Sequence, residues 1–401
     1  SLLEPNGLLL IVGTRWAYCL HPAQKILYGD STVPIYTIGK TKSLGETVFT
    51  HKGTYQKVTN VSSRHAETMV RIQCFTRLED IIVTPEHRLL TPEGWTEAKD
   101  VTDYLAYPIN RTVLTKEQIL AHEIHTSNQT NMPKEYLLDR DFWRLVGYWI
   151  SQGSLTYSRD QGSKNTVSLA FDSRKAWAED AKRIYQKLLK TEAEIAPQKV
   201  KGALVNCVAL KVHNKDLAAF LHENFGEYAH AKRIPRWIEM LPLELQRELL
   251  LGYWRGDGCC DKENGYRISS VSLELLEAVQ RILLRFNIVA AINYGKDAGI
   301  KTILGRVCNT RDSYVVRFSK PDGNTLFGLD FPFERNRHTK SKIVDDFLFL
   351  KVKSVEQFEY NGEAYDLEVE GDHSFCGNLV CYHNSDVYGY IMHDLNPKHA
   401  S

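Results

Sequence analysis

Two patterns of hydrophobic and polar positions alternate along the chain, and they predict a β-rich part interrupted by a helical part. Residues 19–107 contain short segments such as "ETVFTH" and "ETMVRIQCF", in which apolar and polar positions alternate, with Gly, Pro, Asn and Asp between them. A period of two is typical of strands that bury one face. The segment "FLKVKSVEQFEYNGEAYDLEVEGDHSFCGNLVCYHN", near the end of the chain, has the same strand and turn pattern.

The middle of the chain has a helical period and repeats itself. Segments such as "RDFWRLVGYWIS", "SRKAWAEDAKRIYQKLLK" and "SLELLEAVQRILLRFN" have apolar positions at helical spacing. "LVGYWISQGS" (145–154) aligns with "LLGYWRGDGC" (250–259) at an offset of 105 residues. After each of these segments we expect two short strands, a helix, two strands and a helix. Such a duplication predicts a pseudo-symmetric domain.

Composition and length limit the class of protein. The 401 residues are enough for two or three domains. The hydrophobic fraction of 43% and charged fraction of 25% are typical of a soluble globular protein, and no apolar run reaches membrane-spanning length. The eight cysteines form no CxxC pair. We therefore expect no disulfide framework, no signal peptide and a cytoplasmic location.

The charge is distributed unevenly, although the net charge is only +1. Residues 134–346 carry 34 Lys and Arg against 27 Asp and Glu, so the remainder of the chain is acidic. A basic middle between acidic flanks indicates a nucleic-acid-binding module inserted into another domain.

The end of the second β-rich part carries candidate chemistry in His383, Asn384 and Ser385. An Asn side-chain amide can attack its own backbone carbonyl, form a succinimide and break the following peptide bond. A preceding His can protonate the leaving group. The hydroxyl of Ser385 can accept an acyl group.

The start of the first β-rich part carries a candidate nucleophile, Cys19. Its thiol could attack the Tyr18 carbonyl and give a thioester. In "VTPEH", Thr84 and His87 have a TxxH spacing. Thr84 could hydrogen-bond the scissile amide and His87 could protonate its nitrogen. A single Cys, TxxH or His-Asn is usually unremarkable, but together they fall at the borders of one β-rich unit split by an insert.

Together these motifs resemble those of inteins, the protein-splicing HINT domains, that carry a LAGLIDADG homing endonuclease. The resemblance rests on Cys19, "IIVTPEHRLLTPEGWTEAKDV", "AYDLEVEGDHSF" and "VCYHNS", and it covers about residues 19–384. It implies that Asp366 bridges Cys19 and the C-terminal junction, and that His373 assists the cyclisation of Asn384.

The implied reaction has four steps and needs no cofactor. The Cys19 thiol attacks the Tyr18 carbonyl, and the Ser385 hydroxyl then takes the acyl group. Asn384 cyclises and releases the insert, and the ester rearranges to an amide that joins Tyr18 to Ser385.

The resemblance also implies a fold. We expect a mainly β, pseudo-two-fold, horseshoe-like HINT domain, interrupted by an α+β endonuclease domain of two αββαββα repeats. The predicted divisions are 1–18 (N-extein fragment), 19–130 (HINT, N-terminal part), 131–342 (endonuclease, with repeats at 138–230 and 243–335), 343–384 (HINT, C-terminal part) and 385–401 (C-extein fragment). We expect the two flanks to have no fold of their own.

The endonuclease motif departs from the family at one position. Each motif helix ends in an acid that binds a divalent metal ion, Mg²⁺, for phosphodiester hydrolysis. The second acid is Asp257, but the first position is Gln152. An amide is a weaker ligand for a hard cation. Three interpretations stay open: a degenerate endonuclease, a deliberate acid-to-amide change that blocks cutting, and a natural variant that still nicks DNA.

Three basic residues are candidates for DNA contacts. Lys232 and Arg233, in "AKRIPRWI", could contact backbone phosphates, although a solvated loop is an equal alternative. Lys301 belongs to the late strands of the second repeat, where such folds often place a lysine near the scissile phosphate.

The expected partner is double-stranded DNA, the homing site in the host gene without the insert, and we expect a monomer. The joined flanks, "TRWAYSDVYG", are similar to a segment of phage terminase large subunits. Two alternatives remain: a hedgehog-like autoprocessing domain, which needs no Asn cyclisation, and a freestanding homing endonuclease or maturase, which leaves Cys19 unexplained. Cys376 and Cys381 are expected to be core residues.

Overall fold

The computed structural model describes residues 9–13, 18–42, 44–122, 132–157, 164–190, 193–197, 206–261, 265–303, 306–332, 340–385 and 388–392. Contacts divide the chain into two compact units. Unit 1 consists of Ser1–Gln73, Asp80–Ala106 and Val352–Ser401, and unit 2 of Cys74–Glu79 and Tyr107–Lys351. The predicted boundary between residues 130 and 131 lies outside the described residues.

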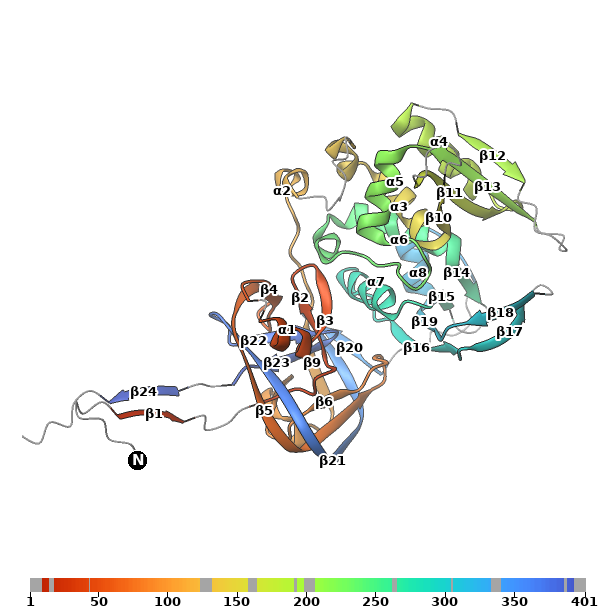
Figure 1. Cartoon of the computed structure of the whole chain (residues 1–401). Coiled ribbons are helices and arrows are strands. Elements are labelled where there is room, and N and C mark those ends of the chain that lie inside the picture. The colour runs from red at the N-terminus through yellow and green to blue at the C-terminus, as the bar shows by residue number, and fades with distance from the viewer. Residues whose placement is uncertain are drawn as a thin grey trace, which may run out of the picture. The chain divides into compact units, whose positions relative to one another are not determined.

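Unit 1 is built mainly from strands, as its alternating sequence predicts. Its elements are β2 (Lys25–Tyr28), β3 (Ser31–Pro34), α1 (Ile35–Thr41), β4 (Thr47–Phe49), β5 (Tyr55–Cys74), β6 (Ile81–Val83), β7 (Arg88–Thr91), β8 (Gly94–Glu97), η1 (Ala98–Asp100), β9 (Tyr104–Pro108), β21 (Phe347–Val369), β22 (Ser374–Gly377) and β23 (Val380–His383). The two long strands, β5 and β21, wrap around the curled sheet (Figure 1).

The strand order of unit 1 interleaves the two ends of the chain. The sheet runs β21-β5-β4-β2-β22-β23-β7-β8, with β3 paired to β2, β6 to β5 and β9 to β21. The hairpin β22–β23 pairs Gly377 with Val380, and the intervening Leu379 takes a positive φ of 56°. This hairpin lies between β2 and β7, so the last residues of the β-rich part are held by strands from its beginning.

The flanking segments pair with each other. β1 (Leu9–Gly13) runs antiparallel to β24 (Tyr388–Met392), with Ile11 opposite Tyr390. The expectation that the flanks have no fold of their own was therefore wrong for these ten residues.

Unit 2 contains the two predicted αββαββα repeats, which confirms the fold class. The first comprises α3 (Arg140–Gln152), β10 (Gly153–Tyr157), β11 (Lys164–Asp172), α4 (Trp177–Leu189), β12 (Glu194–Pro197), β13 (Cys207–His213) and α5 (Lys215–Phe225). The second comprises α6 (Leu243–Asp257), β14 (Gly258–Asp261), β15 (Gly265–Ser270), α7 (Leu273–Arg285), β16 (Ala291–Lys296), β19 (Ser313–Phe318) and α8 (Lys320–Phe327). Further elements of this unit are α2 (Lys116–Ala121), η2 (Lys134–Leu138), η3 (Arg236–Met240) and β20 (Lys342–Val344).

The two repeats have the same sheet topology. The strand orders are β10-β11-β13-β12 in the first and β14-β15-β19-β16 in the second, with antiparallel pairs throughout. The second repeat has an additional hairpin, β17 (Gly299–Ile303) and β18 (Arg306–Thr310), between β16 and β19 (Figure 1). One hydrophobic core holds both repeats, and it includes buried residues of α3 and α6. None of the helices in the described part of the chain is long and apolar enough to cross a membrane.

Candidate functional sites

The position of Cys19 in unit 1 is set by its neighbour Leu20. Leu20 forms antiparallel bridges to Val83 on one side and to Tyr365 on the other. Its N–H donates to the Tyr365 carbonyl at 2.7 Å, and the Tyr365 N–H returns a bond of 3.0 Å. Because Thr84 and Asp366 follow these two partners in sequence, the predicted residues of both motifs are brought to the Cys19 backbone.

Three predicted residues meet at the N-terminal junction. The Cys19 N–H, which belongs to the Tyr18–Cys19 amide, donates to Thr84 Oγ1 at 3.2 Å. The Thr84 N–H donates to the Cys19 carbonyl at 2.9 Å, and the His87 N–H closes the turn on the Thr84 carbonyl at 3.0 Å. The His87 ring lies edge-on to the Tyr18 ring, with the centroids 5.9 Å apart.

Burial sets the protonation states at this junction. Burial, and next the neighbouring Asp366 carboxyl, raise the pKa of the Cys19 thiol to about 12. Burial, followed by the charge of His383, lowers the pKa of His87 to about 3. The resting state therefore holds a neutral thiol beside a neutral imidazole. Both ring nitrogens of His87 lack a hydrogen-bond partner among the described residues, so the one that carries no hydrogen is free to take up a proton.

Ser385, at the C-terminal junction, contacts the Tyr18 carbonyl of the Tyr18–Cys19 peptide bond. Ser385 Oγ donates to the Tyr18 carbonyl oxygen at 3.2 Å, and the Ser385 N–H donates to Asp366 Oδ2 at 2.6 Å. Burial raises the pKa of the Asp366 carboxyl to about 8. Asp366 therefore contacts Ser385 and acts on the Cys19 thiol through its charge, and its raised pKa favours the protonated carboxyl at neutral pH.

His383 and Asn384 directly precede Ser385, and the Asn384–Ser385 peptide bond is the one that cyclisation of Asn384 would break. His383 Nδ1 donates to the Asn384 carbonyl oxygen at 2.7 Å, and the Asn384 N–H donates to the His373 carbonyl at 3.0 Å. Asn384 is buried, and its Oδ1 has no partner within the described chain. The side chain of His373 is exposed, and the hydrogen bond to Asn384 comes from its backbone carbonyl.

Two residues near this bond were not singled out from the sequence. Trp95 of β8 packs edge-on against His383, with the centroids 4.9 Å apart, and against His51 at 5.1 Å. His51 is half-buried, and its Nδ1 lies 2.7 Å from Ser374 Oγ. Their positions depend on strand pairing, which a pattern of single residues does not reveal.

The second site lies in unit 2, where α3 and α6 pack closely. A Cβ atom on Gly147 would lie 2.3 Å from the Leu249 carbonyl oxygen, and one on Gly252 would lie 2.2 Å from the Arg144 carbonyl oxygen. Only glycine allows the two helix backbones to approach this closely. The C-terminal residues of the two helices, Gln152 and Asp257, are consequently brought together.

Gln152 and Asp257 form a pair beside a buried lysine. Gln152 Nε2 donates to Asp257 Oδ1 at 3.2 Å. Burial raises the pKa of Asp257 to about 7, and burial lowers the pKa of Lys232 to about 7. Lys232 Nζ donates to the Trp149 carbonyl at 2.9 Å and lies 3.6 Å from the centroid of the Trp149 ring. Lys232 is thus a neighbour of Asp257 and not an exposed side chain.

The other two basic candidates lie elsewhere. Arg233 is exposed and its guanidinium contacts the Glu223 carbonyl. Lys301 lies on β17, with its ammonium on the Asp297 carbonyl. Lys301 lines neither of the two cavities that Gln152 lines.

Gln152 lines two cavities of unit 2. One, of about 410 Å³, also contains Asp257 and Lys232. The other, of about 520 Å³, contains Arg174, Lys175 and Arg255. Within the described chain, no three His, Cys, Asp or Glu side chains form a ready-made metal site. The donor set fits a Mg²⁺ ion only in part, because one carboxylate and one amide supply oxygen ligands.

The sheets of unit 2 have polar outer faces. Val167, Leu169 and Leu210 point into the core, so the alternate residues of the same strands point outward. The residues on this other face are Ser154, Lys211 and His213 with the buried Thr166 and Ser168 in the first repeat, and Cys259, Arg267, Ser269, Ser313 and Arg317 in the second. Polar and cationic side chains on paired sheets can contact phosphates and base edges.

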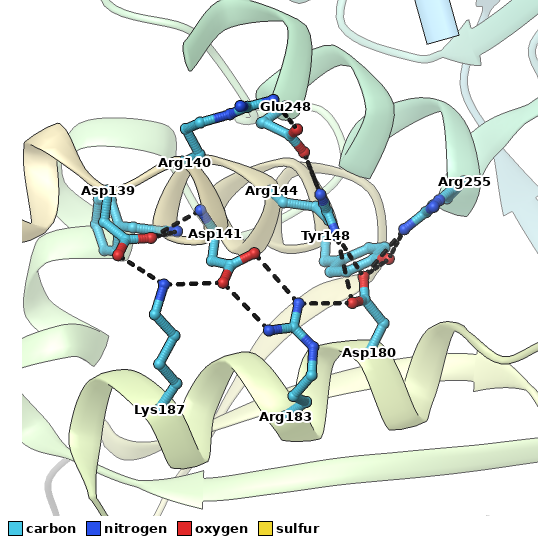
Figure 2. Close-up of polar contacts among 11 residues, drawn as sticks. Asp139, Arg140, Asp141, Arg144, Tyr148, Asp180, Arg183, Lys187, Glu248 and Arg255 are labelled. Carbon is cyan, nitrogen blue, oxygen red and sulfur yellow. Dashed lines mark hydrogen bonds and ion pairs between the residues drawn. The ribbon is translucent and has the colours of Figure 1, made fainter. Parts of the chain in front are cut away.

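A network of ion pairs and hydrogen bonds joins α3, α4 and α6. Figure 2 shows Asp180 of α4 between arginines of all three helices. Asp180 Oδ2 accepts from Arg255 Nη1 at 3.0 Å and from Arg144 Nη1 at 3.3 Å. Arg144 Nε also donates to Glu248 Oε2 at 2.7 Å. Since Arg255 is held on α6 two residues before Asp257, the network orients the end of this helix.

The comparisons with known proteins give a family match within unit 2 and several relatives of the chain. Residues 244–320 match the family of the LAGLIDADG-like domain. The chain is 25% identical to the ATP-dependent DNA helicase Hel308 of Thermococcus kodakarensis, over 95% of this chain and 37% of that protein. It is 27% identical to a DNA polymerase of Thermococcus litoralis, over 73% of this chain and 18% of the polymerase. The chain thus spans a minor part of these relatives.

Two solved structures are similar to parts of the chain. A variant of I-DmoI in complex with its target DNA is 18% identical, with a TM-score of 0.36, and covers 48% of this chain and 98% of its own. A variant of the Ssp DnaB mini-intein is 19% identical, with a TM-score of 0.21, and covers 28% of this chain and 74% of its own.

Proposed function

We propose that this chain, which has the architecture of an intein that carries a LAGLIDADG domain, excises residues 19–384 and joins Tyr18 to Ser385. One observation carries the proposal: the Ser385 hydroxyl donates to the carbonyl oxygen of Tyr18 at 3.2 Å, across the whole length of the insert. Acyl transfer requires this proximity, because a bound nucleophile gains most of its advantage from orientation.

The first step makes a thioester. The Cys19 sulfur attacks the Tyr18 carbonyl carbon, and the bond to the Cys19 nitrogen breaks. The neutral His87 imidazole takes the thiol proton and delivers it to the leaving nitrogen. Thr84 Oγ1 holds the N–H of that nitrogen at 3.2 Å and orients the amide.

The second step moves the acyl group to Ser385. Its hydroxyl oxygen attacks the thioester carbon, the carbon–sulfur bond breaks, and the hydroxyl proton is transferred to the thiolate of Cys19. Asp366 is suited to relay this proton, because its pKa is raised to about 8 and it contacts the Ser385 backbone at 2.6 Å.

The third step releases the insert. The Asn384 side-chain nitrogen attacks the Asn384 carbonyl carbon, and the peptide bond to Ser385 breaks to give a succinimide and a free amine. His383 Nδ1 donates to that carbonyl oxygen at 2.7 Å and stabilises the developing negative charge. The amine of Ser385 then attacks its own ester and forms the new amide.

The mass of the expressed chain over time tests this function. We expect a product that contains residues 19–384 and a ligated peptide of the two flanks. Asn384→Ala should stop release at the C-terminal junction and leave the branched ester, whereas Cys19→Ala should stop thioester formation. Ligation that persists in Cys19→Ala would refute the proposed order of steps. Cleavage without ligation in the parent chain would favour the hedgehog-like alternative.

We also propose that unit 2 binds double-stranded DNA along the polar faces of its two sheets. A divalent ion such as Mg²⁺ would be held by Asp257, and it would supply charge neutralisation for the scissile phosphate. Lys232 lies in the same cavity as Asp257 and can orient a phosphate oxygen. Gln152 leaves the site one carboxylate short, so we expect weak cutting or none.

Restoring a carboxylate at position 152 tests the proposed role of unit 2 in DNA cleavage. Gln152→Glu should increase Mg²⁺-dependent cleavage of DNA that carries the uninterrupted host site, with binding little changed. Adding Asp257→Asn to that variant should abolish the gain. Equal cutting by the parent chain and Gln152→Glu would contradict our account of position 152. The cytoplasmic location, the monomeric state and the terminase identity of the host protein stay predictions.

A further inference from the structure

The N-terminal junction contains a charged side chain that the splicing motifs do not include. Arg64 lies on β5, two residues before Ala66, so both side chains lie on the same face of that strand. Ala66 packs in one buried cluster with Cys19, Met69 and Ala364. The register of β5 therefore places Arg64 on the face of the strand that carries Ala66, and the charge and hydrogen bonding of its guanidinium lower the pKa of the Cys19 thiol.

A carboxylate from the TxxH loop holds Arg64 in this position. Arg64 Nη2 forms an ion pair with Glu86 Oε1, and Glu86 stands between Thr84 and His87 in sequence. The pair lines a cavity of about 510 Å³ together with Pro85. The side chains of Arg64 and Glu86 are 34% and 23% exposed, so the pair is partly buried and partly open to solvent.

The two charges act on the nucleophile in opposite directions. Burial and the Asp366 carboxyl raise the pKa of Cys19, Arg64 opposes them, and Glu86 adds to the increase. Arg64 also contributes to the low pKa of His87, after burial and the charge of His383. The guanidinium thus favours a thiolate over a thiol, and a neutral imidazole over an imidazolium.

We propose that Arg64 is a catalytic residue of the first step, whose guanidinium stabilises the Cys19 thiolate as it attacks the Tyr18 carbonyl, and that Glu86 sets the strength of this effect. The inference rests on the proposed splicing function. The attacking sulfur keeps its hydrogen bond from Arg64 until the carbon–sulfur bond forms, and the thiol proton leaves through His87. No further reactant is needed.

The experiment isolates the first step. In the full chain with Asn384→Ala and Ser385→Ala, the thioester at Tyr18 accumulates and excess hydroxylamine cleaves it, so the cleavage rate reports thioester formation. The rate is measured as a function of pH. We expect Arg64→Met to slow cleavage about tenfold near neutral pH and to move the profile upward by about one pH unit. Arg64→Lys should recover part of the rate.

Glu86→Gln gives the opposite sign. Removing the carboxylate leaves the guanidinium less neutralised, so the pH profile should move downward. The matched control is Arg71→Met, because Arg71 also lies on β5 but pairs with Asp80 at 3.5 Å. This control should keep both the rate and the profile of the parent.

Each outcome decides between the two proposals. Absence of hydroxylamine cleavage in the background chain would refute the splicing function itself. Cleavage in that chain with an unshifted profile in Arg64→Met, or shifts of the same sign in Arg64→Met and Glu86→Gln, would refute the role of Arg64. A structural role alone would lower the rate without moving the pH midpoint.

Discussion

Single residues at the proposed splice junction carry several unsatisfied polar atoms. His87 Nδ1 and Nε2, Asp366 Oδ1 and Asn384 Oδ1 are buried and have no partner among the described residues. Each such atom costs about 1–3 kcal/mol. The proposed reaction accounts for this cost, because these atoms take part in proton transfer and cyclisation. If they were hydrogen-bonded in the resting state, those bonds would have to be broken before the reaction.

The sequence identified most of these residues but not their surroundings. Cys19, Thr84, His87 and Asn384 were predicted because the spacing of a motif can be recognised in the sequence without knowledge of the fold. Arg64 was not singled out, because its contact with Cys19 depends on which face of β5 is directed to the thiol. A register change of one residue would reverse that face.

The buried carboxyl of Asp366 gives a prediction for pH dependence. Its folded pKa is about 8, whereas an unfolded Asp titrates at about 4. The folded state therefore holds a proton that the unfolded state releases between these values, and the free energy of unfolding falls as pH rises through this window. We expect Asp366→Asn to remove this decline, which amounts to at most about 1.4 kcal/mol per pH unit.

The measurement is urea unfolding at about pH 5 and about pH 7.5, in a chain kept intact by Cys19→Ala and Asn384→Ala. The control is Glu370→Gln, because Glu370 is exposed and follows the same strand. If the parent and Asp366→Asn lose the same stability between the two pH values, Asp366 does not titrate in this window.

At the scale of elements, the sequence predicts the helices and strands whose apolar residues recur regularly on one buried face. The helical repeat and the αββαββα order were readable because α3 and α6 direct apolar residues into one core. The hairpin β17–β18 has no such face. Its Ile300 and Val307 are 79% and 75% exposed. The hairpin therefore does not have the alternation of buried apolar and exposed polar residues by which strands are predicted. The burial of Lys232 was missed for a related reason, since its partner is a backbone carbonyl of α3.

The packing of α3 against α6 predicts the effect of adding one methyl group. Gly252→Ala would place a Cβ about 2.2 Å from the Arg144 carbonyl oxygen, and a backbone atom cannot move aside without separating the helices. We expect unit 2 to lose about 1–3 kcal/mol of stability and DNA cleavage by Gln152→Glu to fall, because Asp257 and residue 152 move apart.

Tryptophan fluorescence during urea unfolding measures this loss, since α3 and α6 contribute Trp143, Trp149 and Trp254. The matched control is Arg247→Ala on the exposed face of α6, which should leave the transition in place. An unchanged transition in Gly252→Ala would show that the two helices can separate at little cost.

At the scale of the whole molecule, the junction chemistry is confined to unit 1. Its residues come from both ends of the chain, and the pairing of Leu20 with Val83 and Tyr365 joins them. The two-part organisation was predictable, because the strand pattern returns after the helical insert. The pairing of the flanking strands β1 and β24 was not predictable, because short strands gain stability only from each other.

This confinement predicts that the splicing reaction survives without residues Tyr107–Lys351, the larger segment of unit 2. The Val352 N–H donates to the Asp103 carbonyl at 2.9 Å, so the ends left by removing Tyr107–Lys351 lie close together. A Gly-Ser linker of about six residues spans such a gap as a flexible coil. We expect the shortened chain to excise its remaining insert and to ligate the flanks, because Cys19, Asp366 and Ser385 keep their contacts.

Mass spectrometry measures the ligated peptide, and the same deletion with Cys19→Ala is the control. A shortened chain that keeps its β-sheet circular dichroism but gives no ligated peptide would mean that unit 2 takes part in the reaction.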